Sequence, residues 1–266
     1  MESILDKIQL PGSHPAAGII HYTLHLADNA LVIAHRNSEW CGHGPILEQD
    51  IALANIALDL VGQARNFYQY AAALIAENNL SSITITEDDF AYLRAADEFK
   101  NFLLTEQSNG HWGTTILRQF LFSTYQYFLY RQLQHCSNEH LAAIAQKALK
   151  EVTYHVRWSS EWVIRLGDGT AESHQKMQDA LNELWPFTDE LLTGGLASAA
   201  NISLDDTLIK TEWTEKITSV IADATLHLPT SRQYVYGGTE GKHTPHLTAM
   251  LKDMQYLQRT YPGVEW

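Results

Sequence analysis

Long stretches without helix-breaking residues constrain this sequence more than any other feature. Residues 138–166 contain neither proline nor glycine, and residues 46–77 contain only Gly62. A helix that continued from Pro45 to Glu77 would be roughly 50 Å long at the usual rise per residue. Only 7 prolines and 15 glycines punctuate the 266 residues. Because strands are usually much shorter than such stretches, the sequence predicts an all-α protein.

We expect four long helices followed by shorter ones toward the C-terminus. The predicted long helices span residues 22–40, 45–77, 111–134 and 138–166. Thr86 is the expected N-cap of a short helix, since three acidic residues follow it in the first turn. Further helices are predicted over 172–192 with a bend or break at Pro186, from Ser203, and after Thr244. This pattern indicates a helical bundle with additional C-terminal helices.

Apolar rows on two of these helices predict which faces are buried. The second long helix carries a row that steps by four and three residues, namely Leu47, Ile51, Ala54, Leu58 and Val61. The fourth carries a longer row of similar spacing, namely Leu141, Ala145, Ala148, Val152, His155, Ser159, Trp162 and Leu166. Such rows form the seam of a helix packed lengthwise in a bundle. We therefore expect both rows to face the core.

Charge and composition restrict the partners and the location. The chain has 18 Lys plus Arg against 31 Asp plus Glu, a net charge of -13, which disfavours nucleic acid and anionic membranes as partners. No apolar run approaches the ~18 residues of a membrane span. The first residues lack the apolar segment of a secretory signal, and two cysteines make no disulfide framework. We expect a cytoplasmic protein.

The ligands of a di-iron centre can be sought directly, because long helices with inward polar residues are typical of the ferritin-like bundle. That centre takes a carboxylate from each of two helices and Glu-x-x-His from each of two others. Glu-x-x-His occurs once, at Glu240 and His243 in a Gly-rich segment, where we interpret it as coincidence. No Asp or Glu lies between Glu106 and Glu139, so the third long helix supplies no carboxylate.

Two segments keep the outline of a ligand motif and carry a family resemblance. Asp59-Leu60-Val61-Gly62-Gln63 resembles the Asp-Glu-x-Gly-His segment in the catalytic A subunits of the bacterial ring-1,2-phenylacetyl-CoA epoxidases. Lys150-Glu151-Val152-Thr153-Tyr154-His155 is similar to their Lys-Glu-Glu-x-x-His. The resemblance implies that three ligands are replaced and one histidine is kept. The degenerate ligand positions are Leu60, Gln63, Val152 and His155.

The closer resemblance is to the C subunits of the same enzyme family. It rests on Trp40-Cys41-Gly42-His43, Gly62-Gln63-Ala64-Arg65-Asn66-Phe67 and Met254-Gln255-Tyr256-Leu257-Gln258-Arg259. It implies a structural subunit, inactive alone and without a catalytic group, metal or cofactor of its own. The implied partners are a di-iron A subunit, a B subunit, and a reductase with FAD and an iron-sulfur cluster. Together they use oxygen and NADPH to form the ring 1,2-epoxide of phenylacetyl-CoA.

The resemblance begins near residue 22, so we expect an N-terminal extension over 1–20 and a single ferritin-like helical domain over 21–266. Inward polar residues of that domain should form a hydrogen-bonded network, because an orphaned buried polar group costs on the order of 1 to 3 kcal/mol. The candidate members are Asp28, His35, Glu39, Asp59 and His155.

Several alternatives stay open. The chain could be an iron-binding ferritin-like oxygenase with atypical ligands, namely His155 with Asp28 or Asp59, or an unrelated helical binding module. It could be a monomer or a homodimer. Cys41 and His43 are interpreted as part of a tight turn between helices. The aromatic residues between 120 and 130 surround their helix, so part of them should face a neighbouring subunit if they do not face a core.

Overall fold

The computed structural model describes residues 3–193, 195–230 and 233–264. Within these ranges it contains helices and no strand, apart from one isolated bridge between Ile8 and Ser81. The long helices are α1 (Ala17–Ser38), α2 (Leu47–Glu77), α5 (Trp112–Leu133) and α6 (Glu139–Gly167). The prediction of an all-α protein is confirmed.

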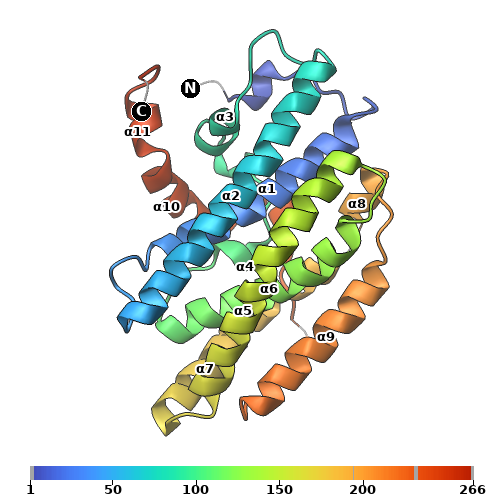
Figure 1. Ribbon diagram of the computed structural model, residues 1–266. Helices are drawn as coiled ribbons and strands as arrows, with labels where there is room; N and C mark the ends of the chain where they lie inside the picture. The colour runs from blue at the N-terminus through green and yellow to red at the C-terminus, as the bar shows by residue number, and fades with distance from the viewer. Residues whose placement is uncertain (1–2, 194, 231–232, 265–266) are drawn as a thin grey trace.

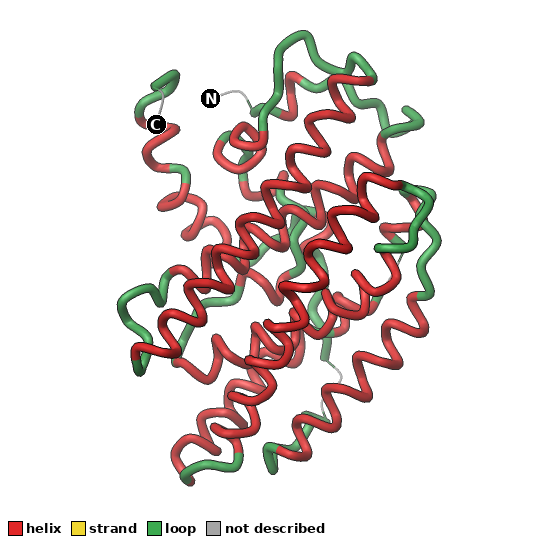
Figure 2. Tube along the Cα trace, in the orientation of Figure 1, coloured by secondary structure: helices red, strands yellow, loops and turns green. Residues whose placement is uncertain are grey.

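The long helices form a ferritin-like bundle made of two hairpins. α1 packs along α2 and α5 packs along α6, while α2 and α6 bring the hairpins together (Figure 1). Short connections between consecutive helices make each pair antiparallel. The tube in Figure 2 shows that the loops joining α1 to α2 and α5 to α6 lie at ends of the bundle. Side chains on facing helices are therefore held at defined levels along the bundle.

Shorter helices surround the bundle. They are α3 (Glu87–Tyr92), α4 (Leu103–Glu106), α7 (Ala171–Leu184), α8 (Leu196–Ala199), α9 (Asp206–Asp223), α10 (Pro245–Met254) and α11 (Tyr256–Thr260). α7 and α9 pack against α5 and α6, and α8 packs against α1. None of the described helices is both long and apolar enough to cross a membrane.

The predicted helix ends are largely confirmed by hydrogen bonds. Thr86 and Asp89 form a capping box in which the backbone N–H of Thr86 donates to the Asp89 carboxylate at 2.8 Å. α7 ends before Pro186, and Pro245 is the first residue of α10. The prediction for Ser203 was wrong by three residues: α9 begins at Asp206, because the carboxylate of Asp205 caps it.

The first helix was predicted to begin at Tyr22, but α1 begins at Ala17. Gly18 does not interrupt it. A Cβ at Gly18 would lie 1.9 Å from the carbonyl oxygen of Ala199, so glycine permits the close approach of α8. Ile4 and Ile20 belong to the hydrophobic core of the bundle. The division between residues 1–20 and 21–266 remains a prediction.

The predicted buried row on α2 was wrong. Its four large members are exposed, Leu47 by 71%, Ile51 by 53%, Leu58 by 69% and Val61 by 44%. The buried face carries Leu53, Ile56, Leu60, Ala64 and Phe67 instead. α2 carries two apolar rows with helical spacing, and only packing against the other helices, above all α1, decides which of them is buried. The row on α6 is buried from Leu141 to Ser159, with Trp162 and Leu166 half-buried.

The aromatic residues of α5 lie within the chain's own packing. Phe120, Phe122, Phe128 and Tyr130 are buried, whereas Tyr125 and Tyr127 are half-buried. α7 and α9 cover this helix, and the indole N–H of Trp213 on α9 donates to the carbonyl of Leu121 at 3.0 Å. These aromatic residues therefore need no neighbouring subunit to cover them.

Candidate functional site

The degenerate ligand positions meet between α2 and α6. Leu60 and Gln63 come from α2, Val152 and His155 come from α6, and all four side chains are buried. The adjacent carboxylates, Asp59 and Glu151, are only partly buried. Leu60 and Gln63, like Val152 and His155, are three residues apart, and residues with this spacing share one face of a helix. The motif spacing in the sequence therefore predicted that each pair would lie at one level of the bundle.

Two short hydrogen-bonded groups fill this level. The side-chain amide of Gln63 donates to Glu151 Oε2 at 2.9 Å, and Gln126 of α5 donates to Gln63 Oε1 at 3.4 Å. His155 Nε2 lies 3.0 Å from Asp59 Oδ2. The other ring nitrogen of His155, Nδ1, is buried and has no hydrogen-bond partner among the described residues. Gln126 was missed by the sequence reasoning, which sought only ionisable ligands.

The surroundings of Glu151 alter its acidity. Burial raises the pKa of the Glu151 carboxyl, and the negative charge of Asp59 raises it further, although the hydrogen bond from Gln63 opposes both. The Asp59 side chain is 38% exposed, while that of His155 is fully buried. The site is thus a polar level between α2 and α6 whose acidic side reaches solvent.

The residues present do not fit a di-iron centre. Such a centre needs carboxylates that bridge and neutralise two iron ions, but Leu60 and Val152 offer only hydrocarbon. α5 supplies the neutral amide of Gln126 to this level. Across the described part of the chain, no three His, Cys, Asp or Glu side chains are grouped so that they could hold a metal ion.

Asp28 lies in a separate cluster that is closed to solvent. Its carboxylate accepts hydrogen bonds from Tyr68 Oη at 2.6 Å, from the backbone N–H of Lys100 at 2.8 Å, and from both terminal nitrogens of Arg94. The side chains of Asp28 and Arg94 are fully buried. Burial, reinforced by the Asp28 charge, raises the pKa of Tyr68 well above its ordinary value. This cluster ties α1 to α2 and to the segment after α3.

The remaining candidates on α1 do not reach the ligand positions. Glu39 accepts from Arg36 at 2.7 Å and from Asn109 at 2.6 Å near the end of the helix. His35 is half-buried, and burial together with the charge of Arg36 lowers its pKa. Of the five residues expected in one network, the structure brings together Asp59 and His155. A functional role for these residues remains a proposal.

His243 forms a third polar group that the sequence reasoning did not find. Its Nδ1 lies 2.7 Å from Glu106 Oε2 and its Nε2 lies 2.9 Å from the carbonyl oxygen of Phe99. Because both neighbours are acceptors, both ring nitrogens must carry hydrogen. Burial alone would lower the pKa of His243, but the hydrogen bond and charge of Glu106 raise it overall. Glu240 instead pairs with the exposed Lys242.

The segment with Cys41 and His43 is the turn that the sequence indicated. The Asp50 carboxylate accepts from the backbone N–H groups of Gly42 and Gly44 at 3.1 and 2.9 Å. Gly42 has a φ of 79°, a left-handed conformation that favours glycine. Cys41 is exposed. The residues of this turn thus join α1 to α2.

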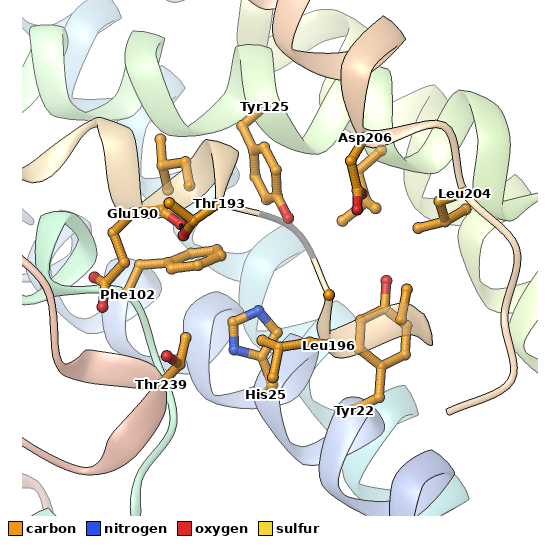
Figure 3. Close-up of a pocket in the computed structure, with 14 residues that line it drawn as sticks. Tyr22, His25, Phe102, Tyr125, Glu190, Thr193, Leu196, Leu204, Asp206 and Thr239 are labelled. Carbon is orange, nitrogen blue, oxygen red and sulfur yellow. Dashed lines mark hydrogen bonds between the residues drawn. The ribbon is translucent and has the colours of Figure 1, made fainter. Parts of the chain in front are cut away.

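A cavity of about 210 Å³ lies on another side of the bundle, between α1, α5 and the C-terminal segments. Figure 3 shows the hydroxyl groups of Tyr22 and Tyr125 pointing into it. His25 Nδ1 donates to the carbonyl of Lys100 at 2.7 Å, and burial lowers the pKa of this histidine. The carboxylate of Glu190, in the wall of the cavity, accepts hydrogen bonds from the backbone N–H groups of Leu103, Gly237 and Gly238. No motif in the sequence indicated this cavity.

The fold and the ligand positions define a ferritin-like bundle that lacks the di-iron ligand set. The family model described as "Phenylacetic acid catabolic protein" matches residues 1–266. The C subunit of 1,2-phenylacetyl-CoA epoxidase from Escherichia coli (strain K12) is 46% identical over 249 residues, which cover 92% of this chain and 98% of that protein. The chain belongs to the phenylacetic acid catabolic protein family, and the resemblance seen in its sequence is confirmed.

Proposed function

We propose that this chain is the C subunit of a 1,2-phenylacetyl-CoA epoxidase and serves there as a non-catalytic structural subunit. One observation carries the proposal: the chain is 46% identical to the C subunit of the E. coli enzyme over 98% of that protein's length. The hydrocarbon side chains at two ligand positions, Leu60 and Val152, support the absence of a catalytic role.

The proposed division of labour follows from the chemistry of the reaction. One atom of dioxygen enters the aromatic ring of phenylacetyl-CoA, and the other leaves as water with two electrons from NADPH. The di-iron centre would belong to a catalytic A subunit, which would act with a B subunit. The electrons would pass through a partner reductase with FAD and an iron-sulfur cluster. We place this assembly in the cytoplasm and assign this chain none of these redox groups.

The internal structure of the chain suits such a supporting role. The buried Asp28–Arg94 pair and the His243–Glu106 pair join segments that are far apart in the sequence. A bundle held by such contacts can present a rigid surface to a partner, because the relative positions of its helices are fixed.

An omission assay tests the proposal. Catalytic subunit, B subunit and reductase from the same source are combined with phenylacetyl-CoA, NADPH and oxygen, with and without this chain, and the epoxide is quantified by mass spectrometry. We expect product only when this chain is present and none from this chain with reductase alone. Full turnover without this chain, or turnover by this chain without the catalytic subunit, would overturn the proposal.

The alternative function is an iron-binding oxygenase with atypical ligands, for which Asp59 and His155, 3.0 Å apart, would be the candidate ligands. It requires iron on the isolated chain, whereas the structural role does not.

A further inference from the structure

The face of α2 that turns away from the bundle carries a row of exposed apolar side chains. Leu47, Ile51, Ala54, Leu58, Val61 and Gly62 follow one another along it, and we call these residues the α2 apolar face. Ala54 and Gly62 are half-buried, and the other four side chains are exposed. Large apolar side chains in a continuous row, rather than scattered singly, mark an interaction site on a protein surface.

Gly62 gives independent support for a partner at this face. It is the only glycine in the 31 residues of α2, and glycine is the poorest helix former after proline. A Cβ added at Gly62 would meet nothing within 4 Å, so packing inside this chain does not require glycine there. Close approach of another chain does explain it, because only glycine lets a second backbone or a bulky side chain contact the helix directly.

The seam between α2 and α6 gives the α2 apolar face an acidic edge, and α6 carries an exposed tyrosine of its own. Tyr154 of α6 is 37% exposed, and tyrosine is enriched at protein interfaces. Asp59 and Glu151 lie between the two helices. Figure 1 shows α2 and α6 running side by side, with neither covered by a further helix in that view. A partner would therefore meet an apolar centre with carboxylates beside it.

We propose that the α2 apolar face docks against an apolar helix of the catalytic subunit, an inference that rests on the proposed function. The steps of four and three residues match the ridges by which two helices interlock. The four large side chains of the row are between 44% and 71% exposed, and contiguous exposed apolar side chains mark an interaction site.

Charge favours a different subunit over a second copy. The chain has a net charge of -13, so two copies repel each other. The carboxylates of Asp59 and Glu151 suit basic residues flanking the partner helix. A homodimer through this face is therefore the competing outcome in the test.

The test compares two variants of the face with a matched control. Leu58→Arg places a cation on the row, and Gly62→Gln fills the open space with a good helix former. Leu208→Arg makes the same change at an exposed leucine of α9. Binding of each variant to the purified catalytic subunit is measured by calorimetry, and the fold is checked by thermal unfolding of the isolated chain.

We expect the unfolding temperature to stay unchanged or to rise for Gly62→Gln, while Leu58→Arg and Gly62→Gln each weaken binding by at least ~30-fold, as for an interface hot spot. Leu208→Arg should bind as the unmodified chain does.

If both face variants bind normally, the docking face is wrong while the proposed function stands. If the unmodified chain fails to bind the catalytic subunit, the proposed function itself fails. Loss of a homodimer by Leu58→Arg, with normal binding to the catalytic subunit, would also overturn the inference.

Discussion

Two polar clusters lie in the same bundle and are built in opposite ways. In the closed cluster of Asp28, Tyr68 and Arg94, ion-paired side chains are fully buried and matched by hydrogen bonds. In the ligand-position cluster of Asp59, Gln63, Glu151 and His155, the carboxylates reach solvent and one buried ring nitrogen lacks a partner. The closed cluster stabilises the fold through a buried ion pair. The open cluster places polar side chains between α2 and α6 while its carboxylates stay partly exposed, so it buries no net charge.

The difference shows how a bundle can keep its shape without the metal ligands. Burying an unpaired carboxylate costs far more than burying a paired one. Leu60 and Val152 avoid that cost with hydrocarbon, and Gln63 replaces a ligand by a neutral amide. Asp59 and Glu151 are half-buried rather than enclosed, so solvent offsets part of the cost of their charges.

Breaking the closed cluster should have the largest effect on stability. Arg94→Ala leaves the Asp28 carboxylate buried and uncompensated, so we expect the free energy of unfolding to fall by about 3 to 5 kcal/mol. Urea denaturation followed by circular dichroism measures it. In the double variant Asp28→Leu/Arg94→Met, both charges are absent and most of the stability should return. A loss below about 1 kcal/mol for Arg94→Ala would show that the pair is solvated.

The His243–Glu106 pair should make stability depend on pH. The pKa of His243 is raised in the folded state above its ordinary value of 6.5. Its contribution is therefore complete below pH 6.5 and is lost as pH rises through the raised pKa. His243→Gln should cost about 1.5 to 3 kcal/mol on the acidic side, as for a hydrogen bond to a charged group.

The measurement is urea denaturation of both proteins between about pH 5 and about pH 9, which covers the ordinary histidine range and extends above it because the pKa of His243 is raised. The difference between the unmodified chain and His243→Gln should shrink toward high pH. Because His21, His25 and His35 are present in both, their effects cancel. A difference that stays constant with pH would contradict a charged His243.

Changes to the ligand-position cluster should have the smallest effect. Asp59→Asn weakens a pair in which one carboxylate is well hydrated, so we expect a loss of at most about 1 kcal/mol. Thermal unfolding of this variant beside Arg94→Ala compares the two clusters directly. A loss as large as that of Arg94→Ala would mean that the open cluster also stabilises the fold.

Local signals predicted much of the fold. The cap at Thr86, the break at Pro186 and the buried row from Leu141 to Ser159 depend on residues close together in the chain, and the structure confirms them. The buried face of α2 could not be chosen, because its exposed and buried faces are both apolar. The exposed row is now better explained by docking than by the core.

The polar clusters were predictable only in part. The motif spacing located Gln63 and His155, but Asp28 meets Arg94 across 66 residues and Glu106 meets His243 across 137. No pattern within either segment specifies such a partner. The histidine of the Glu-x-x-His sequence therefore proved to be part of a buried ion pair, while Glu240 stayed on the surface.

The iron content of the isolated chain tests the central claim most directly. The purified protein is loaded anaerobically with ferrous iron, desalted and measured by elemental analysis, beside its His155→Ala variant and the catalytic subunit. A non-catalytic subunit predicts iron far below one ion per chain, unchanged by His155→Ala, with full occupancy only on the catalytic subunit. One or more ions per chain, lost on His155→Ala, would contradict this account and establish a metal site between α2 and α6.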